Sequence, residues 1–186
     1  DMISSGHSDG VFQFESTGMK SVLERLKPNS VEDLIAVISL YRPGPMDSIP
    51  TYIENRHNPS KIKYKHPLLK DILDITYGCI VYQEQVMQIF RTLAGYSLGR
   101  ADIVRRAMSK KKHDVMERER KIFIEGYVNE NGEIEVEGCL HRGVSREIAE
   151  SIFSEMESFA SYAFNKSHAA AYATVAYQTA WLKCHY

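Results

Sequence analysis

The spacing of apolar residues along the chain predicts a mainly helical protein. In most segments apolar side chains recur every three or four positions, which is the spacing of one helix face. Serine or proline stands at the start of several segments, where a serine hydroxyl can accept a hydrogen bond from a free backbone N–H and proline fits the first turn. Helices are predicted over residues 16–27, 30–40, 67–75, 83–94, 97–112, 113–126, 145–160 and from 167 onward.

Extended structure is predicted in only a few short segments. Val11–Phe14 and Gly78–Val81 are predicted as brief strands, and Asn131-Gly132 is predicted as the turn of a hairpin. Residues 41–67 hold five of the six prolines, which predicts a stiff connection with one short helix near Tyr52. The expected fold is therefore a mainly α, multi-helix domain with minor short β-strands or a hairpin. The domain is expected to span residues 1–186, and one way to divide it is into lobes 1–95 and 96–186.

Composition narrows the class of protein. The hydrophobic share of 44% and the charged share of 25% are ordinary for a soluble globular domain. A formal net charge of −1 argues against a wholly basic nucleic-acid binder, so a polyanion site would need local clustering of bases. Three scattered cysteines without a CxxC pair predict reduced, cytosolic thiols rather than a disulfide frame or zinc site. No apolar run is long enough to span a bilayer, and the two ends of the chain suggest a piece of a longer protein.

The strongest cluster of charge lies between Arg100 and Lys112. It contains six bases and a single acid, Asp102. On a helical wheel one broad face carries Arg105, Arg106, Ser109, Lys110, Lys112 and His113, and the opposite face carries Ile103, Val104, Ala107 and Met108. Lys111 falls on the apolar side. A solvated helix face and a phosphate site both fit this pattern. The near absence of acidic partners and the adjacent guanidinium forks offset the usual preference for a solvated face, so both interpretations stay open.

A second candidate site lies where the last predicted helix begins. Ser167 is the predicted N-cap, and Lys166 and His168 flank it. Free N–H groups of a first helical turn beside two basic residues favour an anion such as phosphate. A purely structural helix start would need the cap but neither basic neighbour. Further along this helix, Ala169, Ala173, Ala176 and Ala180 share a face that predicts close helix packing, while Tyr172, Tyr177 and Trp181 are expected at the core or its edge rather than as base-stacking platforms.

Two other motifs leave alternatives open. The prolines on either side of Gly44 stiffen the backbone after Arg42, which predicts either a rigid corner with a nearby carboxylate or a ligand contact. The segment Tyr82–Met87 begins with polar residues that suit either bases or the backbone, whereas Val86, Met87, Ile89 and Phe90 are predicted to be core. The chain has no GxxxxGK[ST] loop, no HExxH helix and no pair of strand-borne aspartates. It therefore predicts anion binding without a catalytic centre.

Five sequence blocks occur in the order of a known family. They are Gly10–Ser16 (GVFQFES), Leu40–Met46 (LYRPGPM), Val81–Met87 (VYQEQVM), Arg105–Lys112 (RRAMSKKK) and Phe164–Tyr172 (FNKSHAAAY). They are distributed between residues 10 and 172, and over nearly its whole length the chain resembles the fingers domain of the alpha subunit of bacterial DNA polymerase III, the C-family replicative DNA polymerase. The resemblance implies DNA replication by nucleotidyl transfer. It also implies that Mg²⁺ is bound by aspartates of a palm domain that precedes this region.

The resemblance also implies roles for individual residues. Arg105 and Arg106 would face the triphosphate of the incoming deoxynucleotide. Lys166, Ser167 and His168 would line the same pocket, with Arg42 as a neighbour. Lys110, Lys111 and Lys112 would contact template or primer phosphates. The implied partners are primer–template DNA, deoxynucleoside triphosphates, the palm and other replisome subunits in the bacterial cytoplasm, with no membrane. The fragment alone is expected to be inactive.

The chain departs from the family pattern at a few positions. Ser109 stands where many relatives have glycine, and Arg100 where an acid is common, which would make the cluster more basic. Residues 129–145 form a longer stretch than in many relatives. The alternative hypothesis is a stand-alone helical nucleic-acid-binding or replisome-assembly module. A small hydrolase has no nucleophile–base pair to support it.

Overall fold

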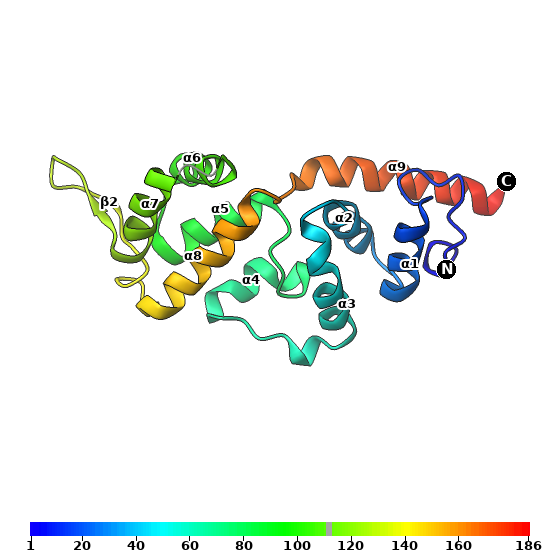
Figure 1. The fold of residues 1–186 in the computed structure, drawn as a ribbon, viewed down its shortest axis with the longest axis horizontal. Coiled ribbons are helices and arrows are strands. Elements are labelled where there is room, and N and C mark those ends of the chain that lie inside the picture. Colours follow the sequence, from blue (N-terminus) through cyan, green and yellow to red (C-terminus); the bar gives the residue numbers. More distant parts are fainter. Residues whose placement is uncertain (111–112) are drawn as a thin grey trace. The chain divides into compact units, whose positions relative to one another are not determined.

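The computed structural model describes residues 1–110 and 113–186, and the chain is grouped into two compact units. Unit 1 contains Asp1–Ile62 and Phe164–Tyr186, and unit 2 contains Lys63–Ala163. Helices dominate both units, so the prediction of a mainly α fold is confirmed (Figure 1). These two units differ from the lobes 1–95 and 96–186. The last helix packs against the second helix, so it belongs to the same unit as the N-terminal part of the chain.

Unit 1 is built from helices that begin and end close to their predicted positions. Ser16 and Ser30 are the N-caps of the first two helices, where their hydroxyls accept hydrogen bonds from the N–H groups of Met19 and Asp33. The proline-rich connection is more helical than expected, because prolines occupy first-turn positions of three short elements. The elements are η1 (Ile3–Ser5), α1 (Thr17–Leu26), α2 (Val31–Leu40), η2 (Pro45–Ser48), α3 (Ile49–His57), η3 (Pro59–Lys61) and α9 (Lys166–His185).

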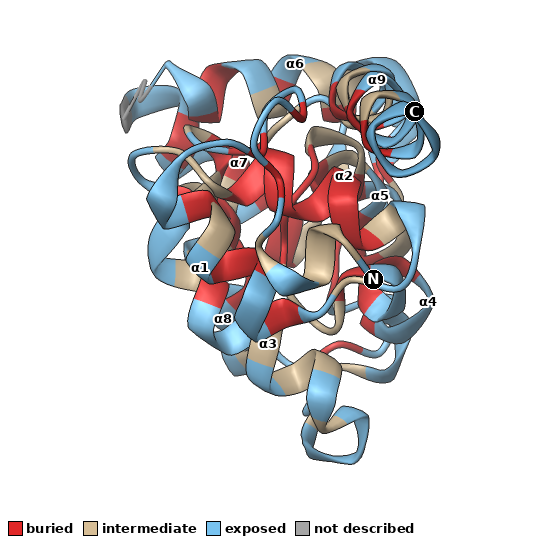
Figure 2. Cartoon of the chain, turned by 90° about the vertical axis from the view of Figure 1, so that its right-hand side faces the viewer, coloured by how far each residue is buried: buried red, intermediate tan, exposed pale blue. Residues whose placement is uncertain are grey.

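Helices α2 and α9 pack side by side in unit 1 (Figure 1). As predicted, α9 turns an alanine face inward, and Ala169, Ala173, Ala176 and Ala180 are all buried. Small side chains allow the two helix backbones to approach closely. Figure 2 shows α9 nearly end-on and largely exposed, whereas α2 is buried along most of its length. Because α9 packs against α2, the first turn of α9 belongs to unit 1.

The predicted strand at Val11–Phe14 is wrong, because these residues form turns. The N–H of Val11 donates to the carbonyl of Ser8, and the N–H of Phe14 donates to the carbonyl of Val11. Gln13 lies in the left-handed region at φ 68°, which ends any extended run. Val11 and Phe14 are both buried, three positions apart, so the apparent alternation was a turn with two inward side chains.

A buried ion pair ties three segments of unit 1 together. The Arg56 side chain on α3 is 10% exposed, and that of Asp33 on α2 is 1% exposed; their closest N···O distance is 3.0 Å. The same guanidinium donates to the carbonyl of Lys27 at 3.1 Å and to the side chain of Asn29 at 2.9 Å. Asp33 also accepts from the N–H of Asn29, so its carboxylate stabilises the turn before α2.

Unit 2 is organised around α5. Three phenylalanine rings in its core, Phe90, Phe123 and Phe153, lie with centroids 5.3 to 6.1 Å apart. Helix α5 contacts α4, α6, α7 and α8. The elements are η4 (Pro67–Leu69), α4 (Lys70–Leu73), η5 (Asp74–Thr76), α5 (Gln83–Ala94), α6 (Leu98–Ser109), α7 (His113–Glu125), β1 (Tyr127–Val128), β2 (Ile134–Val136) and α8 (Arg146–Ala160).

The predicted hairpin is confirmed, with β1 antiparallel to β2 and Tyr127 opposite Val136. Its tip is closed by Asn129, whose side-chain oxygen accepts from the N–H groups of Asn131 and Glu133. At its base, Gly126 and Gly138 have φ values of 92° and 84°, and a Cβ on Gly138 would overlap the backbone of Gly126. Only glycine allows the two backbones to approach so closely.

The predicted strand at Gly78–Val81 is also wrong, because a buried side chain takes the place of a neighbouring strand. The amide oxygen of Gln85 accepts from the N–H groups of Val81 and Tyr82 at 2.9 and 3.0 Å. Its amide nitrogen donates to the carbonyl of Ile72 at 3.1 Å and to the hydroxyl of Thr76 at 2.8 Å. Gln85 is thus structural, and it links α4, the turn at 76–79 and the start of α5. Val86, Ile89 and Phe90 are buried, and Met87 packs against the core, as predicted.

We expect Gln85→Ala to destabilise the chain by about 3 kcal/mol, since buried N–H and C=O groups would lose their partners and a void would form. Gln88→Ala on the same helix, where the side chain is exposed, should change stability by less than about 0.5 kcal/mol. Urea unfolding followed by circular dichroism measures both. Equal losses in the two variants would contradict the structural role of Gln85.

The Asp33–Arg56 pair predicts a loss of stability in acid. Burial raises the pKa of Asp33, but the hydrogen bonds from Arg56 and Asn29 outweigh it and hold the pKa below its ordinary value of 3.8. The stabilisation is therefore complete above the pKa that Asp33 has in the unfolded chain. It is lost as pH falls through the lower pKa that Asp33 has in the folded chain. Asp33→Asn should be less stable than the parent chain at about pH 7, and this difference in the free energy of unfolding should decrease below about pH 4. Denaturant midpoints across this range test it, with exposed Asp47→Asn as the control.

Candidate functional site

Helix α6 presents the two adjacent arginines in different environments. Its N-cap is Ser97, whose hydroxyl accepts from the N–H of Arg100, and its buried residues are Ala101, Val104, Ala107 and Met108. The prediction that Ile103 belongs to the apolar face is wrong, since Ile103 is 69% exposed. The buried face is centred nearer positions 101, 104 and 108. Arg105 therefore lies at the edge of the buried face, with a side chain 13% exposed, and Arg106 lies opposite it, with a side chain 68% exposed.

The interpretation that these arginines are nearly unpaired is also wrong. One oxygen of Asp102 accepts from Nε and Nη2 of Arg105 at 3.1 and 2.7 Å. The other oxygen lies 2.8 Å from Nη2 of Arg106. The hydrogen bond from Arg105 holds the pKa of Asp102 below its ordinary value of 3.8, and Arg106 adds to that effect. A wheel places positions three and four residues apart together, so the spacing of Asp102 before Arg105 and Arg106 was the available signal.

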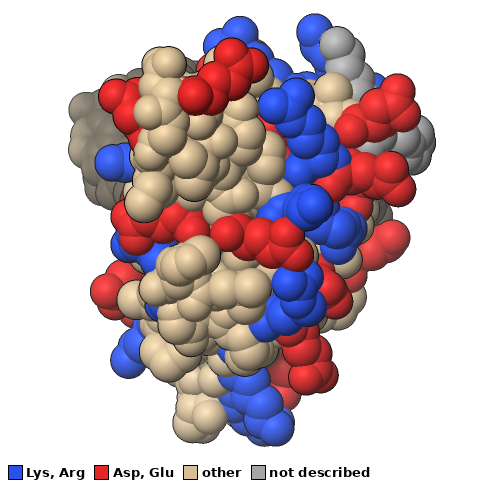
Figure 3. Space-filling view, turned by 90° about the vertical axis from the view of Figure 1, so that its left-hand side faces the viewer, with Lys and Arg blue, Asp and Glu red and all other residues tan. Residues whose placement is uncertain are grey.

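Arg100 does not extend the basic face, contrary to expectation. Its guanidinium pairs with Glu119 at 3.1 Å and with Glu135 at 2.9 Å. It also lies over the ring of Tyr127, with 5.3 Å between the guanidinium carbon and the ring centroid. Both carboxylates are distant in sequence, on α7 and β2. Ion pairs of this kind recur in unit 2, as in Arg120–Glu157 and Arg146–Glu125. On the face in Figure 3, basic and acidic side chains likewise lie next to each other.

The C-terminal end of α6 is tied to α8. The hydroxyl of Ser109 lies 3.0 Å from the carbonyl of Ala160 and 3.1 Å from that of Arg105. Lys110 follows at the C-cap and is exposed. Lys111 and Lys112 lie outside the described residues. Of the three lysines predicted to contact DNA phosphates, only Lys110 is therefore described.

At the start of α9, the N-cap is Asn165 rather than the predicted Ser167. The Asn165 side chain accepts from the N–H of His168 at 2.9 Å, and its own backbone is extended. Ser167 consequently lies inside the first turn, and both Ser167 and His168 are exposed. The ammonium group of Lys166 pairs with Glu32 on α2 at 3.1 Å. The first turn thus presents a hydroxyl and an imidazole to solvent beside an ion-paired lysine.

In unit 1, the Arg42 guanidinium and the His168 ring both contact the ring of Phe164. The guanidinium of Arg42 lies over the ring of Phe164 at 4.4 Å, and Nε donates to the carbonyl of Ser39. Burial lowers the pKa of Arg42. Phe164, His168 and Tyr172 follow at four-residue spacing, with ring centroids 5.4 and 4.4 Å apart. That spacing is visible in the sequence, whereas the contact between Arg42 and Phe164 is not, because the two residues are far apart along the chain.

The predicted binding residues therefore fall into two groups, one in each unit. Arg42, Lys166, Ser167 and His168 lie in unit 1, around the first turn of α9. Arg105, Arg106 and Lys110 lie in unit 2, along α6. In both groups a basic side chain already pairs with a carboxylate from the same unit. An anion that bound to Arg105, Arg106 or Lys166 would therefore have to displace a carboxylate.

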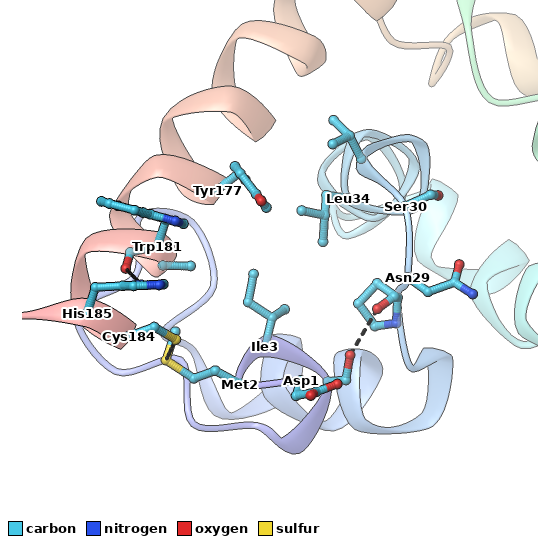
Figure 4. Close-up of a pocket in the computed structure, with 14 residues that line it drawn as sticks. Asp1, Met2, Ile3, Asn29, Ser30, Leu34, Tyr177, Trp181, Cys184 and His185 are labelled. Atoms are coloured by element: carbon cyan, nitrogen blue, oxygen red, sulfur yellow. Dashed lines mark hydrogen bonds between the residues drawn. The ribbon is translucent and has the colours of Figure 1, made fainter.

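Unit 1 also contains a cavity of about 410 Å³ that the sequence pattern did not indicate. Figure 4 shows Tyr177, Trp181 and His185 along α9 on one side, with Ile3 and Leu34 facing them. The Trp181 and His185 rings stack at 4.4 Å. Their four-residue spacing was the available signal. None of the residues predicted to bind phosphate lines this cavity. Tyr177 and Trp181 are about half exposed, which places them at the edge rather than in the core.

Within residues 1–110 and 113–186, no three side chains of histidine, cysteine, aspartate or glutamate are grouped so that they could hold a metal ion. None of the helices described there combines the length and apolar character that crossing a membrane requires.

The chain is similar to known proteins over its full length. The model of the bacterial DNA polymerase III alpha subunit finger domain matches residues 1–131. The DNA polymerase III subunit alpha of Staphylococcus aureus strain N315 is 50% identical over 186 residues, which is all of this chain and 16% of that protein. The corresponding subunit of Rickettsia bellii is 51% identical over 185 residues, or 15% of its length. The chain thus spans about a sixth of the curated relatives that it matches.

The unequal burial of the two arginines predicts unequal effects on stability. Arg105→Ala should destabilise the chain by about 1 to 2 kcal/mol, because a mostly buried guanidinium and its two hydrogen bonds are lost. Arg106→Ala should change stability by less than about 0.5 kcal/mol, since exposed ion pairs contribute little. Urea denaturation of the two variants measures the difference. A larger loss for Arg106→Ala would show that the burial difference does not govern their contributions.

Proposed function

The chain belongs to the family of bacterial DNA polymerase III alpha subunit finger domains, and we propose that it acts as the fingers of a replicative DNA polymerase. In this role it binds the triphosphate of the incoming deoxynucleotide and the nascent base pair during template-directed DNA synthesis. The observation that carries the proposal is the 50% identity to DNA polymerase III subunit alpha along all 186 residues. The same match supports primer–template DNA, the palm and other replisome subunits as partners, in the bacterial cytoplasm.

Arg106 is the residue best suited to contact the triphosphate from α6. Its side chain is 68% exposed, and a guanidinium can donate two parallel hydrogen bonds to phosphate oxygens. Transfer of the nucleotide to the primer 3′-hydroxyl releases pyrophosphate, and negative charge must be stabilised on the leaving group. In the proposal Arg106 supplies that positive charge. Arg105, which is more buried, contributes through its own guanidinium and through the position of α6.

The first turn of α9 supports a second contribution to nucleotide binding. Its N–H groups carry the positive end of the helix dipole, and Ser167 and His168 are exposed beside them. Lys166 adds positive charge when it leaves Glu32, and Arg42 is proposed as a neighbouring contact. Lys110, with Lys111 and Lys112, is proposed to bind template or primer phosphates. Such contacts add affinity without sequence preference.

Magnesium chemistry is assigned to the palm of the longer polymerase. No cluster of three potential metal ligands is present among the described residues, and in the proposal the metal-binding aspartates belong to the palm. When bound to the palm, Mg²⁺ activates the primer hydroxyl and neutralises phosphate charge. The fingers residues bind and orient the nucleotide. We accordingly propose that the isolated chain does not incorporate nucleotides.

In the full-length polymerase, Arg106→Ala should raise the KM for deoxynucleotide by about tenfold or more, because a charge-assisted hydrogen bond to phosphate is lost. The Kd for primed DNA should stay within about twofold of the parent value. Steady-state kinetics and DNA binding by fluorescence anisotropy measure the two quantities. Arg91→Ala, which removes an exposed arginine from α5 of the same unit, is the control.

The opposite pattern would overturn the assignment. If Arg106→Ala weakened DNA binding and left the nucleotide KM unchanged, Arg106 would bind nucleic acid rather than the triphosphate. That result would favour the alternative of a nucleic-acid-binding module.

A further inference from the structure

The two oxygens of the Asp102 carboxylate have different partners. Oδ1 accepts both hydrogen bonds from Arg105, at 3.1 and 2.7 Å. Oδ2 pairs with Nη2 of Arg106 at 2.8 Å. Among the described residues, Arg106 makes no other ion pair or side-chain hydrogen bond. The guanidinium proposed to contact the nucleotide is therefore held by a single carboxylate oxygen.

We propose that Asp102 is a competing carboxylate that holds Arg106 until a triphosphate or pyrophosphate displaces it, and that Arg105 stays on Asp102 throughout. This inference rests on the proposed function, because it needs Arg106 to bind the phosphates of the nucleotide. Asp102 is a positioning residue in this scheme, since it acts on the nucleotide only through Arg106.

The unequal exposure of the two pairs explains why one is exchanged and the other is kept. Arg105 is bound by two hydrogen bonds and has a side chain 13% exposed. Arg106 has one partner and a side chain 68% exposed, and exposed ion pairs of this kind are weak. A polyphosphate carries more negative charge than a carboxylate and offers several acceptor oxygens. It can therefore take Arg106 from Oδ2 and leave the pair at Oδ1 intact.

The competition has a predictable effect on affinity. Nucleotide binds tightly only to the fraction of molecules in which Arg106 has left Asp102, so the apparent affinity is lowered by that fraction. For an exposed pair the factor is about two to five. Pyrophosphate, which would use the same guanidinium, should be affected by the same factor. Binding of DNA, which does not use Arg106 in this scheme, should not be affected.

Asp102→Asn separates the two functions of the side chain. An asparagine amide oxygen can still accept from Arg105, whereas its NH₂ group cannot accept from Arg106. In the full-length polymerase, the variant should lower the nucleotide KM and the inhibition constant of pyrophosphate by about two- to fivefold. Both kcat and the Kd for primed DNA should stay unchanged. The gain in affinity should shrink as salt concentration rises, because salt screens the exposed pair.

Two controls test whether the effect passes through Arg106. Asp114→Asn removes one negative charge from an exposed position on α7 that pairs with neither arginine, and it should leave the nucleotide KM unchanged. In an Arg106→Ala background, Asp102→Asn should no longer lower the KM, because the pair is already broken. A residual gain in that background would mean that general electrostatics, rather than competition for Arg106, causes the effect.

A second comparison makes the test independent of how well the asparagine variant folds. Asp102→Glu keeps the acceptor and should not lower the nucleotide KM, whereas Asp102→Gln should give a KM about two to five times lower than Asp102→Glu. Equal values for Glu and Gln, or an unchanged KM in Asp102→Asn, would overturn the competition. If instead Arg106→Ala alone left the KM unchanged, the proposed nucleotide contact itself would fail.

Discussion

The buried amide of Gln85 fixes the arrangement of unit 2. It binds the backbone of α4 and of the segment before α5, so the buried N–H groups of Val81 and Tyr82 have a partner within the core. Helix α5 begins at that point, and α6 packs against it. The positions of Arg105 and Arg106 on α6 therefore depend on an interaction at the start of the neighbouring helix. One polar side chain of the motif Tyr82–Met87 thus has a structural role, which requires no contact with DNA.

Ion pairing determines what the basic residues can do. With 23 bases and 24 acids in the chain, a guanidinium in a packed domain is close to a carboxylate more often than not. Asp102, Glu32 and Glu119 each take a base that the sequence pattern had left open for ligands. An anion that bound to Arg106 or Lys166 would have to displace the carboxylate that each now contacts. The strength of that ion pair would then be part of the affinity for the anion.

Local signals in the sequence were sufficient for much of the fold. Ser16, Ser30, Ser97 and Ser145 cap helices as predicted, because capping is decided within three residues of the helix start. Contacts between distant segments could not be predicted in this way. Arg100 meets Glu119 and Glu135 only after α7 and the hairpin have folded. The same holds for the candidate site. Residue types and the family resemblance indicated its candidate residues, but not the carboxylates that pair with them.

The hairpin between α7 and α8 offers an experimental use. Its strand ends are fixed where Gly126 and Gly138 meet, and its tip is bonded internally through Asn129. Residues 130–135 are exposed. A change of length at the tip therefore transmits little strain to the core. A fluorophore attached at the exposed tip would report on movements of unit 2.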